Sequence, residues 1–258
     1  MIYAGLDIGS RTIKAALFDT TNQTMIACKL RDQGLDQQEL ARDIYNNALN
    51  EAGLDKSSII RSVATGYGRN SIDFADTTIT EITCHAAGVR QLHPDARTII
   101  DIGGEDSKVI RLDDRGRVQD FAMNDRCAAG TGRFLEIVAR RLEGDLNSVA
   151  RAAEGCSNPV AISSMCVVFA ETEIIGLLAS GTSVQDIMAG VQKAIASRTV
   201  GMVGKHARPP FYLTGGVALV PGMARALSDA LGHEIRVSRN AQFTGALGAA
   251  ILASRQAA

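Results

Sequence analysis

A short sequence pattern occurs twice in this chain, and its repetition limits the folds that the chain can adopt. The segment DIGSRTIKAALFD begins at Asp7, and the segment DIGGEDSKVIRLD begins at Asp101. In each copy an apolar strand ends in aspartate, a glycine turn follows, and an alternating strand leads away, which is the pattern of a β-hairpin. A third strand pattern follows each hairpin, at residues 25–30 and 118–123. We therefore predict two related lobes, each begun by a three-stranded meander.

The remainder of the chain alternates helical and strand patterns. Apolar residues at positions 40, 44 and 48 predict a helix that Gly53 can end, before a strand at residues 59–65. Later patterns predict helices at 134–142, 222–231 and from Ser183 and Thr244 onwards, and strands at 210–216 and 234–238. This order predicts an α/β fold of two lobes with a cleft between them. The expected lobes are residues 1–95 plus 243–258, and residues 96–242.

Composition excludes several classes of function. The 258 residues carry a net charge of −1, with basic residues spread along the chain, which argues against a nucleic-acid-binding protein. The apolar runs are too short for a membrane span, and Asp7 interrupts the N-terminus too early for a signal peptide. We expect a cytoplasmic protein whose five cysteines are thiols or metal ligands and not disulfides.

The two glycine turns have the composition of phosphate-binding loops. Glycine leaves backbone N–H groups open to phosphate oxygens, and an aspartate at a strand end can hold Mg²⁺. Asp7 and Asp101 are therefore predicted Mg²⁺ ligands. A third glycine pair follows an apolar strand and would let a nucleoside approach the backbone. The predicted nucleotide-binding residues are Gly9, Ser10, Arg11, Thr12, Gly103, Gly104, Asp106, Gly215, Gly216 and Val217.

A simpler interpretation is that each turn has no binding role, because a single aspartate–glycine pair usually marks only a turn. The repetition in matching context, followed by a TGG segment, favours phosphate binding. The sequence contains neither a GxxxxGK[ST] loop nor a complete dinucleotide fingerprint, so neither of these motifs binds the nucleotide. Lys14 and Lys108, on the alternating strands, are expected to be solvated and not to bind phosphate.

The order of these segments resembles that of the actin, Hsp70 and sugar-kinase superfamily of ATPases, which has a duplicated ribonuclease H-like fold. There the hairpin turns are phosphate loops and the TGG segment is the adenosine loop. NDRCAAGTGRFLE and SSMCVVFAETEII are similar, more narrowly, to the cluster-ligand segments of activator ATPases of 2-hydroxyacyl-CoA dehydratases. This is the family of benzoyl-CoA reductase and 2-hydroxyglutaryl-CoA dehydratase activators. ATGYGRNS, EITCHAAG and ASRTVG are also typical of it, so the resemblance covers essentially the whole chain.

The resemblance implies that Cys127 and Cys166 ligate a [4Fe–4S] cluster. Such a cluster usually takes four thiolates, so two chains in a homodimer would share one cluster. Each cysteine precedes a predicted helix, and helix N-termini carry partial positive charge that lowers thiol pKa values and would stabilise an anionic cluster.

The other cysteines and their neighbours receive structural interpretations. Cys28, Cys84 and Cys156 are expected to be small, buried apolar residues. His85 is expected to be a hydrogen-bonded structural histidine. Asp125 and Arg126 would either orient the cysteine loop or simply form a turn.

One position departs from the family pattern, because Glu105 stands where many such activators carry glutamine. A carboxylate there can accept a proton from an attacking water, whereas an amide can only orient it. The predicted catalytic residues are therefore Glu105, Asp101 and Asp7. Glu105 would either raise basal ATP hydrolysis or mark a subfamily with another partner.

The implied function is that of an ATP-dependent, low-potential one-electron donor with ATP or ADP, Mg²⁺ and the cluster as cofactors. Reduced ferredoxin or flavodoxin would supply the electron, and a 2-hydroxyacyl-CoA dehydratase would receive it. One alternative is the ATPase subunit of a benzoyl-CoA reductase or the reductase of a double-cubane cluster protein. More distant alternatives are a small-metabolite kinase and a non-catalytic actin-like assembly protein.

Overall fold

The structure is a computed structural model that describes residues 1–125, 127–164 and 166–256. Arg126, which we place in the cysteine loop, lies outside these ranges. The chain forms two compact units, each of which is described by itself. The first comprises Met1–Ala96, Leu112–Gln119 and Gln242–Ala258, and the second comprises Arg97–Arg111 and Asp120–Ala241.

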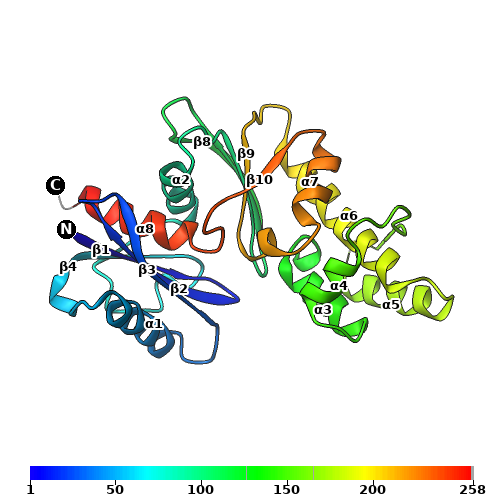
Figure 1. The fold of residues 1–258 in the computed structure, drawn as a ribbon, viewed down its shortest axis with the longest axis horizontal. Helices are drawn as coiled ribbons and strands as arrows, with labels where there is room; N and C mark the ends of the chain where they lie inside the picture. The colour runs from blue at the N-terminus through cyan, green and yellow to red at the C-terminus, as the bar shows by residue number, and fades with distance from the viewer. Residues whose placement is uncertain (126, 165, 257–258) are drawn as a thin grey trace. The chain divides into compact units, whose positions relative to one another are not determined.

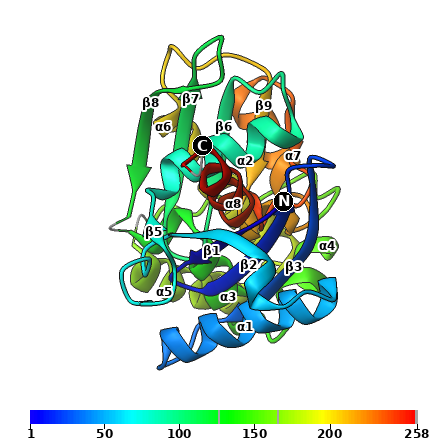
Figure 2. The ribbon, with the colours of Figure 1, turned by 90° about the vertical axis from the view of Figure 1, so that its left-hand side faces the viewer.

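The first unit is a five-stranded sheet between helices (Figures 1 and 2). Its strands, in the order β3-β2-β1-β4-β5, are β1 (Ile2–Ile8), β2 (Thr12–Asp19), β3 (Thr24–Asp32), β4 (Ile59–Thr65) and β5 (Thr77–Thr78). Alternate residues of β1 enter different clusters. Leu6 and Ile8 pack with α1 (Gln37–Ala52), whereas Tyr3 packs with α8 (Thr244–Gln256). Helix α2 (Glu81–Leu92) lies against α8.

The second unit repeats this strand order. Its sheet runs β10-β9-β6-β7-β8, so β6 to β10 correspond one for one to β1 to β5. These strands are β6 (Thr98–Ile102), β7 (Ser107–Leu112), β8 (Val118–Asn124), β9 (Phe211–Thr214) and β10 (Ile235–Val237). The duplication inferred from two short segments therefore extends to five strands in each described sheet.

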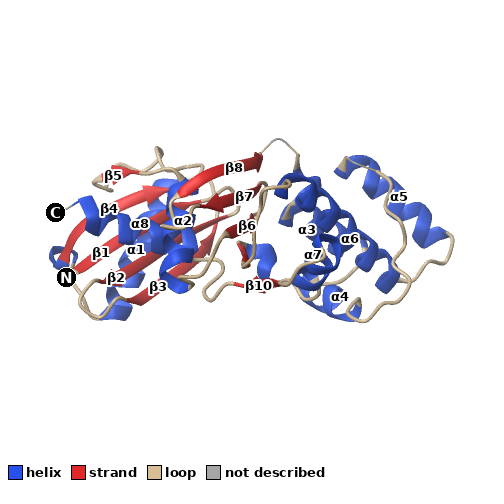
Figure 3. Ribbon diagram, turned by 90° about the horizontal axis from the view of Figure 1, so that it is seen from above, coloured by secondary structure: helices blue, strands red, loops and turns tan. Residues whose placement is uncertain are grey.

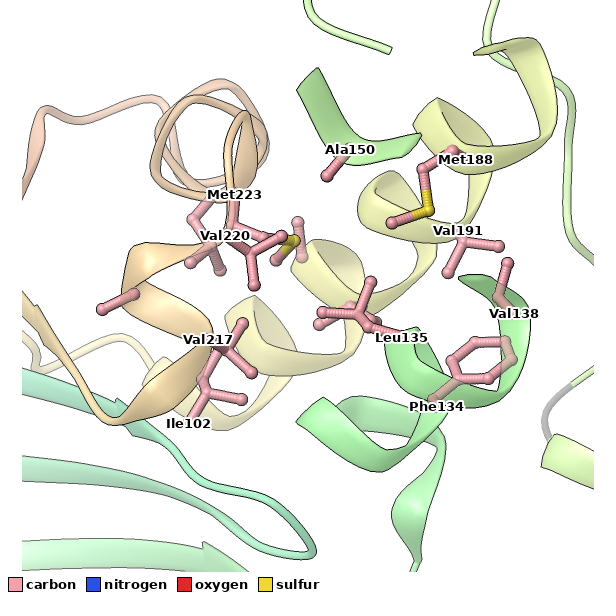
Figure 4. Packing of buried hydrophobic residues seen from close by; sticks show 14 of the residues in the cluster. Ile102, Phe134, Leu135, Val138, Ala150, Met188, Val191, Val217, Val220 and Met223 are labelled. Carbon is pink, nitrogen blue, oxygen red and sulfur yellow. The ribbon is translucent and has the colours of Figure 1, made fainter. Parts of the chain in front are cut away.

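A layer of helices packs beside the second sheet. It contains α3 (Gly132–Arg141), α4 (Leu146–Ala152), α5 (Val167–Ala179), α6 (Val184–Val203) and α7 (Met223–Leu231). Figure 4 shows how Leu135 of α3 and Val191 of α6 converge with Val217, which follows β9. Helix α5 lies at the outer edge of this layer (Figures 1 and 3) and buries only Ala170 and Ile174 among its residues.

The predicted helix boundaries are confirmed where their signals are local. Asp36 caps α1 by accepting from the N–H of Glu39, and Gly53 ends that helix in the left-handed conformation. Ser183 caps α6 and also donates to Asp186, as its capping-box pattern indicates. No helix in the described ranges combines the length and apolar character that a bilayer span requires.

Glycines allow the backbones of α2 and α8 to touch. A Cβ added to Gly248 would lie 1.7 Å from the carbonyl oxygen of Cys84, and one added to Gly88 would lie 2.0 Å from that of Thr244. Both obstacles are backbone atoms, which cannot rotate away. By contrast, a Cβ on Gly201 of α6 would meet nothing within 4 Å.

We expect Gly248→Ala to lower the free energy of unfolding by about 3 kcal/mol, because α8 must move away from α2. Gly201→Ala is the control and should be neutral or stabilising by about 0.5–1 kcal/mol, because alanine has less backbone entropy to lose in a helix. Urea unfolding followed by circular dichroism measures both. Equal stability of the two variants would contradict the close packing of α2 on α8.

Candidate active site

In the first unit, the turn between β1 and β2 follows a buried carboxylate. Asp7 is the second-last residue of β1 and faces Lys14 across the β1–β2 register, with 3.2 Å between Lys14 Nζ and Asp7 Oδ2. The turn is closed by a hydrogen bond of 3.1 Å from Gly9 N–H to the carbonyl of Thr12. A Cβ on Gly9 would lie 2.9 Å from that carbonyl oxygen, so the tight turn favours glycine. Ser10 and Arg11 occupy the tip, where Arg11 pairs with Asp32.

The second unit builds the same arrangement between β6 and β7. Lys108 Nζ lies 3.3 Å from Asp101 Oδ2 and 2.7 Å from Asp106 Oδ2. Asp101 also accepts a hydrogen bond of 2.7 Å from the hydroxyl of Thr214 on β9. Asp101 and Lys108 are each 2 % exposed, so this charge cluster lies out of water. Glu105, by contrast, is exposed in the β6–β7 loop.

The expectation that both lysines are solvated is wrong. The antiparallel register sets each lysine opposite the aspartate that precedes the glycine turn, at Asp7–Lys14 and Asp101–Lys108. A buried carboxylate requires a compensating charge, and the ammonium group supplies it. The lysines therefore neutralise the carboxylates predicted to hold Mg²⁺.

The third predicted loop lies against the second. Gly215 follows Thr214 and has a φ of +85°. A Cβ on Gly215 would lie 2.2 Å from the carbonyl oxygen of Ile102, the last residue of β6. Gly215 N–H donates to Ala241, and Val217 is buried beside Gly132 at the start of α3. The second unit thus places Gly215–Val217 next to the Gly103–Asp106 turn.

The first unit has a counterpart of this loop that is not among the predicted site residues. Thr65 pairs with Asp7 in the β1–β4 register, as Thr214 pairs with Asp101 in the β6–β9 register. Gly66 follows with a φ of +90°, and its added Cβ would lie 2.5 Å from Asp7 Oδ1. Thr65 Oγ1 is buried and has no hydrogen-bond partner among the described residues. The repeated Thr–Gly pair after β4 and β9 was the available sequence signal.

The Cys127 segment is hydrogen-bonded directly to the second glycine turn. Gly132 N–H donates to the Gly103 carbonyl at 2.9 Å, and Arg133 N–H donates to the Gly104 carbonyl at 2.8 Å. Ser107, the first residue of β7, donates from its hydroxyl to the Gly130 carbonyl at 2.7 Å. The first N–H groups of α3 have no partner within the helix, and the loop carbonyls satisfy two of them.

Cys127 does not itself begin α3, which corrects the expectation of a helix N-terminus at both cysteines. It precedes a short 3-10 turn, Ala128–Gly130, and Thr131 lies between that turn and α3. The Thr131 hydroxyl donates to the Ala128 carbonyl at 2.7 Å and so closes the 3-10 turn before α3 begins. Cys166 does begin a helix, because it is the N-cap of α5. Both thiols are exposed.

The loop before Cys166 is held by a carboxylate of the helix that follows it. Glu173 of α5 accepts from the backbone N–H and hydroxyl of Ser163 and from the N–H of Ser164, at 2.8, 2.9 and 2.9 Å. Burial acts to raise the pKa of Glu173, but the hydrogen bonds from Ser163 and Ser164 outweigh it and lower the pKa to about 2. The carboxylate therefore stays ionised and holds the loop throughout the neutral range.

The remaining cysteines have separate environments. Cys84 is buried, and burial raises the pKa of its thiol to about 12. Cys28 and Cys156 are only half-buried, which corrects the expectation for both. Cys156 donates to Asp186, and that hydrogen bond raises the pKa of the thiol. His85 bonds to the Thr244 hydroxyl at 3.0 Å, so its predicted structural role is confirmed.

A hollow of about 1260 Å³ in the second unit begins where the third loop ends. Its walls include Lys193 and Ser197 of α6, Leu219 after Val217, and Arg225 of α7. Gln192 shapes one wall by donating to the Pro221 carbonyl at 2.7 Å. Sequence patterns gave no signal for this hollow, because its residues come from helices far apart along the chain.

The donor groups at these sites differ in the metals they suit. Buried carboxylates at Asp7 and Asp101 are hard oxygen donors, which suit Mg²⁺, and exposed thiols at Cys127 and Cys166 are soft donors, which suit iron–sulfur clusters. Across the described parts of the chain, no three histidine, cysteine or carboxylate side chains gather as one metal-binding group. A four-thiolate cluster at these two cysteines would therefore need ligands from elsewhere.

Comparison with known proteins identifies the class to which this fold and site belong. Residues 4–253 match the model of the BadF/BadG/BcrA/BcrD ATPase family, and the chain belongs to that family. It is 44 % identical to the activator of lactoyl-CoA dehydratase of Anaerotignum propionicum over 98 % of this chain and 97 % of that protein.

Solved structures give the same result. The activator of 2-hydroxyisocaproyl-CoA dehydratase from Clostridium difficile, with bound ADPNP, has a TM-score of 0.94 at 39 % identity, covering 100 % of this chain and 96 % of that one. Component A of (R)-2-hydroxyglutaryl-CoA dehydratase from Acidaminococcus fermentans has a TM-score of 0.93 at 39 % identity, covering 100 % and 99 %. A ROK family glucokinase from Streptomyces griseus, 14 % identical with a TM-score of 0.60, shares the fold alone. The predicted actin/Hsp70/sugar-kinase-like fold is confirmed.

Glu173→Gln should loosen the loop before Cys166. We expect faster hydrogen exchange at the Ser163 and Ser164 amides, because a neutral amide accepts more weakly than a carboxylate. In the unmodified protein this protection should persist through about pH 4–5, where ordinary glutamates protonate, and be lost only as the pH falls toward 2. Arg140→Gln, on the exposed face of α3, is the control. Exchange that does not differ between Glu173→Gln and the unmodified protein would contradict this role.

Proposed function

We propose that this protein is an ATP-hydrolysing activator that delivers a low-potential electron to an iron–sulfur 2-hydroxyacyl-CoA dehydratase or a related iron–sulfur reductase. The observation that carries the proposal is the direct bonding of the Cys127 segment to the second glycine turn, from Gly132 to Gly103 and from Arg133 to Gly104. This bonding joins a phosphate-binding turn to an exposed thiol in one unit. The membership of the chain in an ATPase family and its similarity to two dehydratase activators support the proposal.

The two glycine turns bind the polyphosphate in this proposal. Backbone N–H groups of Gly9–Thr12 and Gly103–Asp106 would donate to phosphate oxygens, while Asp7 and Asp101 would hold Mg²⁺. The positive charges of Lys14 and Lys108 already compensate these carboxylates, so magnesium would compete with or displace the ammonium groups. Gly215, Gly216 and Val217, with the hollow beyond them, would receive the nucleoside.

Hydrolysis requires a group that accepts a proton from the attacking water. Glu105 is exposed in the second turn, next to Gly104, and is free to take this role. Asp101 is unsuited to it, because it already accepts from Thr214 and pairs with Lys108. Glu105 is therefore the proposed base, and Asp7 and Asp101 are the proposed magnesium ligands.

Cys127 and Cys166 would ligate a [4Fe–4S] cluster, which supplies one-electron redox chemistry when bound. Two thiols per chain provide half of the usual four, so a homodimer with one cluster follows from the proposal. Both thiols are exposed, as a shared ligand set requires. Ferredoxin or flavodoxin is the proposed electron source.

Cys127→Ala and Cys166→Ala should each abolish the cluster and electron delivery while leaving ATP binding intact. Cys28→Ala, Cys84→Ala and Cys156→Ala are the matched controls and should retain the cluster. Iron and sulfide analysis of anaerobically purified protein, with its mass in solution, should give about one four-iron cluster per two chains. A complete cluster in each monomer, or its loss in all five variants, would contradict the proposal.

Glu105→Gln separates the base from the magnesium ligands. We expect basal ATP hydrolysis to fall by about tenfold or more, because the amide cannot accept the proton, with nucleotide affinity unchanged. Asp101→Asn should instead weaken Mg-ATP binding. Turnover and nucleotide binding measured on the same samples test both. Unchanged turnover in Glu105→Gln would exclude Glu105 as the base.

A further inference from the structure

The guanidinium group of Arg198 contacts both cysteine segments. Its Nη2 donates to the carbonyl of Ser164 at 2.8 Å, and its Nη1 donates to the carbonyl of Ala129 at 3.3 Å. Ser164 lies two residues before Cys166, and Ala129 lies two residues after Cys127. One side chain therefore spans the two loops that carry the exposed thiols.

Arg198 is anchored on a well-buried element. It lies on α6, whose Val191 and Ile195 are fully buried in the core of the second unit. The next residue, Thr199, is buried as well, and its hydroxyl bonds to the Ile195 carbonyl. Arg198 itself is half-buried. The planar guanidinium group on a rigid helix holds its two acceptor carbonyls at a fixed separation. A flexible lysine ammonium group, which is a single point charge, cannot do this.

The two cysteine segments have different connections to the glycine turn. The Cys127 segment is bonded to Gly103, Gly104 and Ser107. The Ser163–Ser164 loop before Cys166 is bonded to Glu173 of its own helix and to Arg198. Among the described residues, Arg198 hydrogen-bonds to both loops themselves, whereas Arg141 of α3 pairs with Glu171 farther along α5.

We propose that Arg198 is a positioning residue that makes the two cysteine segments respond together when nucleotide binds at the second glycine turn. A shift of the Gly103 and Gly104 carbonyls displaces the start of α3 and with it the Cys127 segment. Arg198 then carries that displacement to the loop before Cys166. This inference rests on the proposed nucleotide binding but not on the presence of a cluster.

The test uses alkylation of the full-length, iron-free protein under reducing conditions, with peptide mapping of Cys127 and Cys166. In the unmodified protein, Mg-ATP should change the alkylation rates of both thiols. In Arg198→Gln the response of Cys127 should remain, whereas that of Cys166 should fall by about fivefold or more. Arg198→Lys should behave like Arg198→Gln, because one ammonium cannot span both carbonyls. Arg140→Gln is the control and should respond like the unmodified protein.

Several outcomes would overturn the inference. One is a normal change of the Cys166 alkylation rate with Mg-ATP in either Arg198 variant. Another is a variant in which the Cys127 rate also stops changing. The third is an unmodified protein that binds Mg-ATP but shows no change at either thiol. Direct measurement of nucleotide binding separates these from failure of the proposed function, in which the unmodified protein would bind no Mg-ATP. Circular dichroism checks the fold, and Arg198→Lys, which retains the charge, carries the test if Arg198→Gln does not fold.

Discussion

The hydrogen bonds from Gly132 to Gly103 and from Arg133 to Gly104 are the constraint on which the rest of the candidate site depends. They use the first unpaired N–H groups of α3, which lacks a side-chain cap at Thr131. The turn thereby replaces the cap, so that the position of α3 is determined by the glycine turn. Gly132 makes this contact easier, since an added Cβ would lie 3.1 Å from the Gly103 carbonyl oxygen and the loop would have to shift slightly. The start of α3 is therefore tied directly to the turn.

Duplication explains why each glycine turn is accompanied by the same polar groups. An aspartate is the second-last residue of the first strand, a lysine faces it from the second, and a threonine faces it from the fourth, in both sheets. The two copies differ in the hydrogen bonding of the threonine and in the presence of exposed cysteines. In the second unit Thr214 donates to Asp101, whereas in the first unit Thr65 Oγ1 lacks a partner among the described residues. The second unit alone carries both exposed cysteines.

The fold was predictable from sequence because its signals are local or repeated. Strand β4, the end of α1 at Gly53, the cap at Ser183 and the closing helix follow from alternation, capping residues and small residues at their own positions. The burial of Lys108 was not predictable, since it depends on a cross-strand register and on Asp106 turning back toward it. The contacts of Arg198 join residues separated by 69 and 34 positions, and no pattern along the chain indicates them.

The position of Arg198 also bears on the hollow in the second unit. Ser197, its neighbour, and Lys193, about one turn earlier, line that hollow, while Arg198 itself contacts the two cysteine segments. Successive residues of a helix point about 100° apart, so α6 presents one side to the hollow and another to the cysteine segments. A nucleoside in the hollow would thus contact the same helix that holds those segments. In the proposed function, phosphate at the second glycine turn would act on Cys127 through α3, and a nucleoside in the hollow would act on both segments through α6, so the two ends of one nucleotide would reach the thiols by separate helices.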